Sequence, residues 1–300
     1  MFNFKLFLAI AILTMFQLIA FSSTSTPIKK VFLKEGQIYL DSGNGQELIQ
    51  VTNNGDEKYS PSLEPFAQDK IIYHGKIERD SEPSSFLTVI DLEGKTIKKI
   101  PFNRMAREIK NIDWLPSGLL GIESWGRGRS SEYSIMEYDT GTIISVFWGN
   151  NFSLSGDRTK ILFSQGIPGG YIPNPEFETL VVMLGDVTKL QKHDIDKAIF
   201  NNDAEIIYST KGMLENKNIY ELESDYFWNP DNEGFAFIDK YGNNKYLIVI
   251  NIKDEKQFET QKYLLDAKVN KVKEITWGTQ KNTICITDQI TTWNISLTKN

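Results

Sequence analysis

From Lys29 onward, the chain shows short apolar runs rather than long amphipathic ones. The runs are rich in Ile, Val, Tyr, Phe and Thr, and turns of Gly, Asn, Asp and Pro separate them. No apolar pattern at a spacing of 3.6 residues is sustained. This pattern is typical of β-strands joined by tight turns. The body of the chain is therefore predicted to be all-β, with little helix outside residues 1–22.

The apolar runs form two alternating units. One unit is an apolar or aromatic strand, a polar turn and a second strand, and its clearest copy is residues 151–163. The other is a strand, an Asp-Gly-type turn and a strand, as in residues 87–97. Alternation of the two gives four strands per repeat. The six copies of the first unit have their anchor residues at Leu63, Trp114, Phe152, Phe200, Trp228 and Trp277.

The repeat length points to one architecture. Six anchors give about 45 residues per repeat, which matches a four-stranded propeller blade. We therefore expect a six-bladed β-propeller of four-stranded blades, and strand-like sequence at both chain ends predicts that N- and C-terminal strands close the ring. The interval from Phe200 to Trp228 is 28 residues, so either the fourth anchor is misplaced or that blade has lost strands. A pair of β-sandwiches is the alternative architecture, and it would not need the repeat.

The polar turns also carry a family resemblance. Pro61-Ser62, residues 153–157 (Ser-Leu-Ser-Gly-Asp) and residues 228–231 (Trp-Asn-Pro-Asp) resemble the Pro-Ser-x-Ser-Pro-Asp-Gly-like turn of TolB-like propellers. The resemblance covers most of residues 31–297, with degenerate copies. It implies a six-bladed β-propeller and no catalytic residue, because the motif is a structural turn.

The N-terminal segment has the order of a secretory signal peptide. Lys5 precedes an almost purely apolar run from Leu6 to Phe21, and small residues follow. We expect cleavage after Ser22, so that residues 23–300 form a single extracytoplasmic propeller domain, secreted or periplasmic, without a stable membrane span. Cleavage would leave 32 basic and 39 acidic residues, a net charge of −7. The alternative is an uncleaved anchor, although the run is shorter than the roughly 20 residues that cross a bilayer.

Composition removes several classes of function. One cysteine excludes a disulfide framework and multi-cysteine metal sites. The net charge of −6 argues against non-specific nucleic-acid binding. Neither Gly-x-Ser-x-Gly nor His-Glu-x-x-His occurs, and His74 is interpreted as a polar strand end. We expect no cofactor, no metal, no catalytic residue and a monomer.

Loop length gives the best functional clue. In a four-stranded blade, connections between the second and third strands share one face with those between blades. Four long connections, residues 75–85, 124–132, 165–178 and 211–218, are assigned to this class. Long loops on a rigid scaffold are common binding sites.

Two of these connections supply the candidate ligand-binding residues, Trp125, Arg127, Arg129 and Tyr171. The guanidinium groups of Arg127 and Arg129 suit a carboxylate or phosphate, and the Trp125 indole offers a stacking surface. The alternative is that both connections are merely solvated loops.

Three functions remain open. The first is a non-enzymatic propeller that binds a protein or cell-envelope component through its long-loop face. The second is a propeller-type enzyme, a glycan lyase or hydrolase acting at the central channel. The third is a structural accessory domain without a ligand.

Overall fold

The structure is a computed structural model. It describes residues 30–43, 45, 47–75, 85–102, 108–125, 131–166, 180–190, 204–209, 224–241, 244–254, 257–266, 269, 272, 274–278, 283–288 and 291–297. All regular elements in these ranges are β-strands except one 3₁₀ turn, Pro116–Gly118, which confirms the all-β prediction. None of the described elements is a helix of the length and apolarity that a membrane crossing requires.

Antiparallel neighbours along the chain build five sheets. Their strands are β1 (Lys30–Lys34), β2 (Gln37–Asp41) and β3 (Ile49–Gln50); β4 (Lys58–Leu63), β5 (Lys70–Gly75), β6 (Ser85–Asp91) and β7 (Thr96–Phe102); β8 (Ile109–Leu115), β9 (Leu119–Trp125), β10 (Ser131–Glu137), β11 (Ile143–Leu154), β12 (Lys160–Gly166), β13 (Leu180–Asp186) and β14 (Ala204–Ser209); β15 (Phe227–Trp228), β16 (Gly234–Tyr241), β17 (Asn244–Asp254) and β18 (Gln257–Leu264); and β19 (Glu274–Trp277), β20 (Thr283–Thr287) and β21 (Thr292–Ser296).

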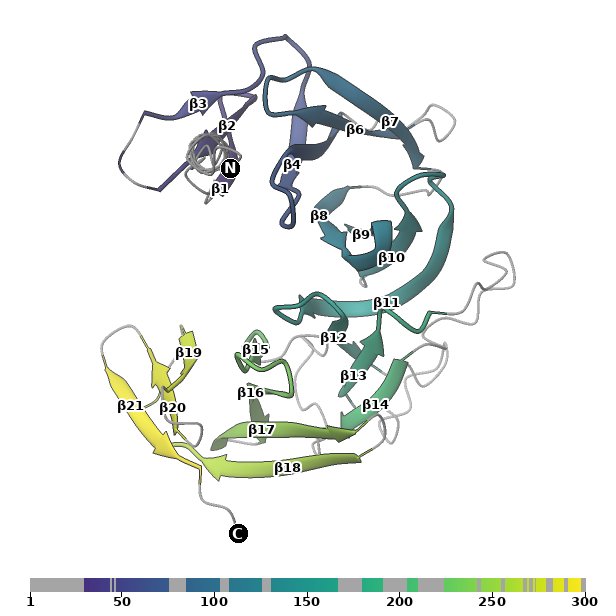
Figure 1. Cartoon of the computed structure of the whole chain (residues 1–300). Helices are drawn as coiled ribbons and strands as arrows, with labels where there is room; N and C mark the ends of the chain where they lie inside the picture. The colour runs from purple at the N-terminus through teal and green to yellow at the C-terminus, as the bar shows by residue number, and fades with distance from the viewer. Residues whose placement is uncertain are drawn as a thin grey trace, which may run out of the picture.

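The sheets follow one another around an arc, as the blades of a β-propeller do (Figure 1). Strands β4, β8, β15 and β19 lie toward the middle, whereas β7, β18 and β21 lie outside. Five buried apolar clusters lie between neighbouring groups of strands. In one of them, Ile72 of β5 packs with Ile112 of β8 and Leu120 of β9. Because the inner sheets are covered on both faces, their strands are continuous apolar runs rather than alternating ones.

Strand β11 belongs to two groups of strands. Its first half pairs with β10 and its second half with β12, and the register shifts between Asn150 and Ser153. Gly149 lies where the two halves meet, and a Cβ atom there would be 2.5 Å from the carbonyl oxygen of Ser164. Only glycine fits this approach. The seven-stranded sheet therefore consists of two four-stranded groups that share β11.

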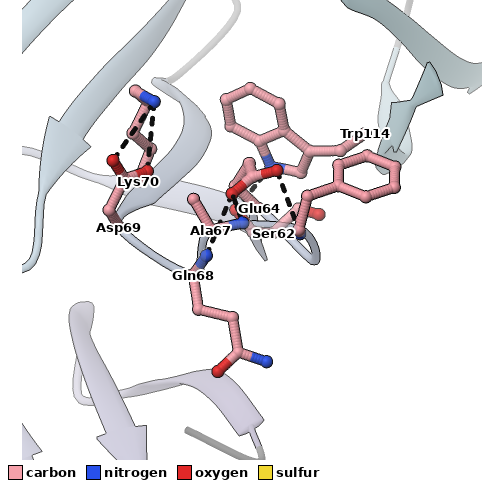
Figure 2. Close-up of polar contacts among 8 residues, drawn as sticks. Ser62, Glu64, Ala67, Gln68, Asp69, Lys70 and Trp114 are labelled. Atoms are coloured by element: carbon pink, nitrogen blue, oxygen red, sulfur yellow. Dashed lines mark hydrogen bonds and ion pairs between the residues drawn. The ribbon is translucent and has the colours of Figure 1, made fainter. Parts of the chain in front are cut away.

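Three tryptophans tie neighbouring groups of strands together. Each indole N–H donates to a backbone carbonyl of the preceding group, and Figure 2 shows the first of these bonds. Such a bond adds about 1 kcal/mol net when buried. The pairs are Trp114 with Ser62 (3.1 Å), Trp228 with Ser153 (3.4 Å) and Trp277 with Phe227 (3.1 Å). These tryptophans are predicted anchor residues, so the repeat signal reports contacts between groups of strands.

The polar turns close on themselves. In Figure 2 the Glu64 carboxylate accepts hydrogen bonds from the backbone N–H groups of Phe66, Ala67 and Gln68, at 3.0, 2.6 and 3.0 Å. In the turn after β15, the Asn229 side chain likewise accepts from two backbone N–H groups. The turn motif thus has the structural role that the family resemblance implies.

Two details of the predicted ring are corrected. The expected closure by N- and C-terminal strands is absent among the described residues, because β1–β3 and β19–β21 form separate sheets. Strand β1 pairs with β2 through a turn at Glu35 and Gly36, both at positive φ. A local hairpin costs far less chain entropy than pairing the two ends of the chain.

The fourth repeat also differs from the prediction. Residues 204–208 of that copy belong to β14, which pairs with β13 at the edge of a sheet and opens no new one. The anchor Phe200 itself lies outside the described residues. The short interval before Trp228 therefore reflects a misplaced anchor, which is one of the two explanations that the sequence left open.

Candidate functional site

Strand order puts the ends of β5, β9 and β12 on one side of the arc, together with the starts of β4 and β8. We call this the long-connection side. Three of the predicted connections do join second and third strands of a group. The fourth, residues 211–218, lies outside the described residues and comes between β14 and β15 in the sequence, so it joins two sheets; the end of β14 lies on the long-connection side.

Of the predicted site residues, the structure places Trp125. It is the last residue of β9, at the long-connection side, and 37% of its surface is exposed. Arg127, Arg129 and Tyr171 lie outside the described residues. The backbone N–H of Trp125 donates to the carbonyl of Glu108, which fixes the end of the strand.

A lysine from the neighbouring strand orients the Trp125 ring. The Lys110 ammonium lies 4.4 Å from the ring centroid, donates to the Ser131 hydroxyl at 2.7 Å and lies 3.4 Å from a Glu123 carboxylate oxygen. Burial raises the pKa of Glu123, and the Lys110 charge opposes that shift. A cation over an indole contributes about 0.5–1 kcal/mol at exposed sites. The ring is therefore held in place while remaining accessible.

A second carboxyl group lies deeper in the same group of strands. Asp113 of β8 accepts a hydrogen bond from the Tyr133 hydroxyl and another from the Asn111 side chain, both at 2.9 Å. Burial raises the pKa of Asp113, whereas the Tyr133 bond and the Arg158 charge lower it. Gly121 makes room for the tyrosine, because a Cβ atom there would lie 2.0 Å from the Tyr133 hydroxyl.

The two carboxyl groups are close enough to interact, since the charge of Asp113 raises the pKa of Glu123. Sequence reasoning missed this pair, which comes from adjacent strands. A usable signal was present: Asp113 stands between the apolar residues Ile112 and Trp114, and Gly121 stands in the next strand where a branched residue is expected. Chemically, the cluster offers two acids with raised pKa values, one ammonium group and one indole.

A third group on this side centres on Tyr59 and His74. Their rings stack at 5.2 Å with an interplanar angle of 20°. The Tyr59 hydroxyl donates to Glu57 at 3.0 Å, and His74 Nδ1 lies 2.8 Å from the Gly75 carbonyl oxygen. Burial lowers the pKa of His74, so the neutral imidazole is favoured. His74 is 5% exposed, and its ring packs against the Tyr59 ring. It lies near the end of β5, where a polar strand end was predicted.

On the opposite side, which carries the short turns, the described residues line two hollows. One of about 550 Å³ lies beside Asp186, Lys189 and Lys253. Two of its lysines form ion pairs, Lys189 with Asp186 at 3.5 Å and Lys253 with Glu259 at 2.8 Å, and Lys160 donates to the backbone carbonyl of Asn232 at 3.3 Å. The other, of about 380 Å³, lies between the β4–β5 and β8–β9 turns and is lined by Phe66, which is 64% exposed.

Comparisons with known proteins bear on the fold. No family model matches the chain, and no curated protein matches it. TolB from Acinetobacter baumannii is similar in structure over 79% of this chain and 51% of its own, at 16% identity and a TM-score of 0.44. The β-propeller domain of the Trilobed protease from Pyrococcus furiosus is similar over 90% and 80%, at 14% identity and 0.46. A prolyl endopeptidase is similar over 85% of this chain and 35% of its own, at 11% identity and 0.50.

The chain thus spans about half the length of that TolB structure and about a third of the endopeptidase. At these identities the likeness concerns the fold alone.

Proposed function

We propose that this chain is an extracytoplasmic, non-enzymatic β-propeller that binds a protein or cell-envelope ligand through its long-connection side. In this proposal residues 1–22 are a cleaved signal peptide. The blades number six: the groups beginning at β1, β4, β8, β15 and β19, and the group that β11 shares with its neighbour. The TolB-like turns at residues 61–62, 153–157 and 228–231 support this count.

The observation that carries the proposal is the fixed and accessible indole of Trp125. Aromatic side chains with restrained rotamers lose little entropy on binding, which is why they dominate binding hot spots. Lys110 restrains the ring. The connection that follows Trp125 in the sequence contains Arg127 and Arg129. An anionic group on the ligand would suit these arginines.

The test is retention of envelope material by the full chain carrying a C-terminal tag. Wild type should retain at least one component of the envelope fraction of its producing cell, and Trp125→Ala should lose it. Phe66→Ala is the matched control, because Phe66 is an exposed aromatic residue on the opposite side. Equal retention by Trp125→Ala and wild type would remove this side from the function.

A second candidate, a glycan hydrolase or lyase, is favoured by one observation. Asp113 and Glu123 form a pair of carboxyl groups with raised pKa values, and such pairs serve as acids and bases in glycoside cleavage. The two hydrogen bonds on Asp113 and its burial favour a structural role instead. Release of reducing ends or unsaturated uronides by wild type, lost in Asp113→Asn and Glu123→Gln, would establish the enzyme. If the wild-type chain neither retains envelope material nor cleaves a glycan in these assays, the remaining function is a structural accessory domain without a ligand.

A further inference from the structure

We propose that Tyr59 and Trp125 form a two-ring platform for an oligosaccharide on the long-connection side. This inference rests on the proposed function and deepens it, because it names a glycan as the ligand class.

The Tyr59 ring has the geometry of a sugar-stacking surface. One of its faces packs on His74 at 5.2 Å, and its hydroxyl is tied to Glu57, while 41% of the residue stays exposed. Pyranose rings present a face of C–H groups, which carry partial positive charge and pack on the negative face of an aromatic ring. A ring supported from beneath and tethered at its hydroxyl loses little freedom when a sugar covers it.

Trp125 repeats this arrangement on the neighbouring group of strands. Lys110 restrains its ring from one side, at 4.4 Å from the centroid, and 37% of the residue stays exposed. The strand of Tyr59, β4, contacts β8, which pairs with β9 and so lies beside the strand of Trp125. The Ser60 hydroxyl donates to the backbone carbonyl of Lys110 in β8 at 3.0 Å. Ser60 directly follows Tyr59, and the Lys110 side chain reaches from this contact to the Trp125 ring. The two rings can therefore each bind a different sugar unit of one oligosaccharide.

The polar groups around the rings suit hydroxyl groups. Glu57 lies beside Tyr59, and the Lys110 ammonium lies over the Trp125 ring with Glu123 next to it. Carboxylates accept hydrogen bonds from sugar hydroxyls, and ammonium groups donate to them. A protein partner would favour a continuous apolar patch with charges at its rim. Here charged groups lie directly beside each ring, so the observations favour a glycan over a protein.

The test is isothermal titration calorimetry on the full chain with chitotetraose, cellotetraose and tetragalacturonic acid, each compared with its monosaccharide. At least one tetrasaccharide should bind, at least tenfold more tightly than its monosaccharide. Tyr59→Ala and Trp125→Ala should each weaken tetrasaccharide binding about tenfold, equivalent to about 1.4 kcal/mol. Both should also reduce the advantage of the tetrasaccharide over the monosaccharide.

Three further variants keep the result interpretable. Tyr59→Phe and Trp125→Tyr preserve a ring and should retain most of the affinity, which separates loss of stacking from loss of folding. Phe66→Ala, on the opposite side, should bind as wild type does. Equal tetrasaccharide affinity in wild type and both alanine variants, or no binding of any of the three probes, would overturn the proposal.

The envelope assay separates failure of this inference from failure of the proposed function. Retention that depends on Trp125, survives periodate oxidation of glycans and is destroyed by protease would identify a protein ligand. In that case the binding side stands and the glycan is refuted. Absence of any Trp125-dependent retention would refute both.

Discussion

Tyr133→Phe tests whether the hydrogen bond to Asp113 stabilises the fold as its geometry indicates. The substitution removes one hydroxyl and keeps a ring that is 1% exposed. The lost hydroxyl lies 2.9 Å from an Asp113 carboxylate oxygen. Packing of the ring against Phe152, at 5.3 Å between centroids, should survive. The change therefore isolates one buried, charge-assisted bond.

The size of the effect should depend on pH. Burial raises the native pKa of Asp113 above its ordinary value of 3.8, so its favourable contribution is complete below that pH and is lost as pH rises through the native pKa. The Tyr133 bond opposes this loss because it favours the ionised form. Without it, the native pKa rises further and more stability disappears toward neutral pH. We expect a cost of about 0.5–1.5 kcal/mol near pH 3.5, where the acceptor is neutral, and about 1.5–3 kcal/mol at pH 7.

Urea unfolding of wild type and variant at pH 3.5, 5 and 7 measures this difference. Burial raises the pKa of Glu123 as well, but Glu123 is present in both proteins and its effect on their difference largely cancels. Tyr263→Phe is the matched control, because the Tyr263 hydroxyl donates to the uncharged Gln261 side chain at 2.6 Å. Its cost should not vary with pH. A Tyr133→Phe cost that is equal at pH 3.5 and pH 7, or below 0.5 kcal/mol throughout, would refute the reasoning.

Three other outcomes are expected. Gly121→Ala should destabilise by about 1–3 kcal/mol in urea unfolding, because the new methyl group overlaps the Tyr133 hydroxyl; an unchanged midpoint would mean that the strands separate freely. Trp277→Phe should cost about 1 kcal/mol by the same measurement, since it removes an indole bond to the preceding sheet, and a neutral result would show that this tie adds nothing. Replacing Arg127 and Arg129 with Ala should weaken an anionic partner by about 2–5 kcal/mol if the pair is desolvated in the complex and leave the melting temperature nearly unchanged; a large drop in melting temperature would make both arginines structural.

The strand pattern and the anchors could be predicted because they depend on local chemistry. A strand covered on both faces must be apolar throughout, so runs such as Ile71-Ile72-Tyr73 stand out in the sequence. Trp114, Trp228 and Trp277 recur because each one makes the same indole bond to the preceding group of strands. Repeats that encode a contact are visible even when the rest of the unit has diverged.

The predictions of the fourth anchor and of the ring closure were wrong because neither feature depends on local sequence. Residues 204–208 have the composition of any strand, and only pairing with β13 makes them an edge. The shared strand β11 hides a boundary, since no turn separates its two halves. Closure concerns two ends of the chain, and the short hairpin of β1 and β2 forms irrespective of what the C-terminus does.

The site could be predicted only where the sequence itself is unusual. Trp125 attracted attention because an aromatic residue adjoins two arginines in a long connection. Lys110, Asp113 and Glu123 did not, because their proximity depends on the antiparallel register of β8 and β9. Tyr59 carries even less signal, since a tyrosine in a strand normally packs in a core, and its exposure depends on His74 beneath it.

The two sides of the arc differ in what their polar residues do. On the short-turn side, the side chains of Glu64 and Asn229 accept hydrogen bonds from the backbone of their own turns. Substitutions there should lower stability without affecting ligand binding. On the long-connection side, Lys110 and Glu57 instead hold aromatic rings that remain exposed. A fold that needed these rings only for packing would bury them, because each exposed ring gives up about 25 cal/mol of stabilisation for every Å² of apolar surface left in water. The structure therefore restrains the rings of Tyr59 and Trp125 without burying them, which is the arrangement expected of side chains kept ready for a partner.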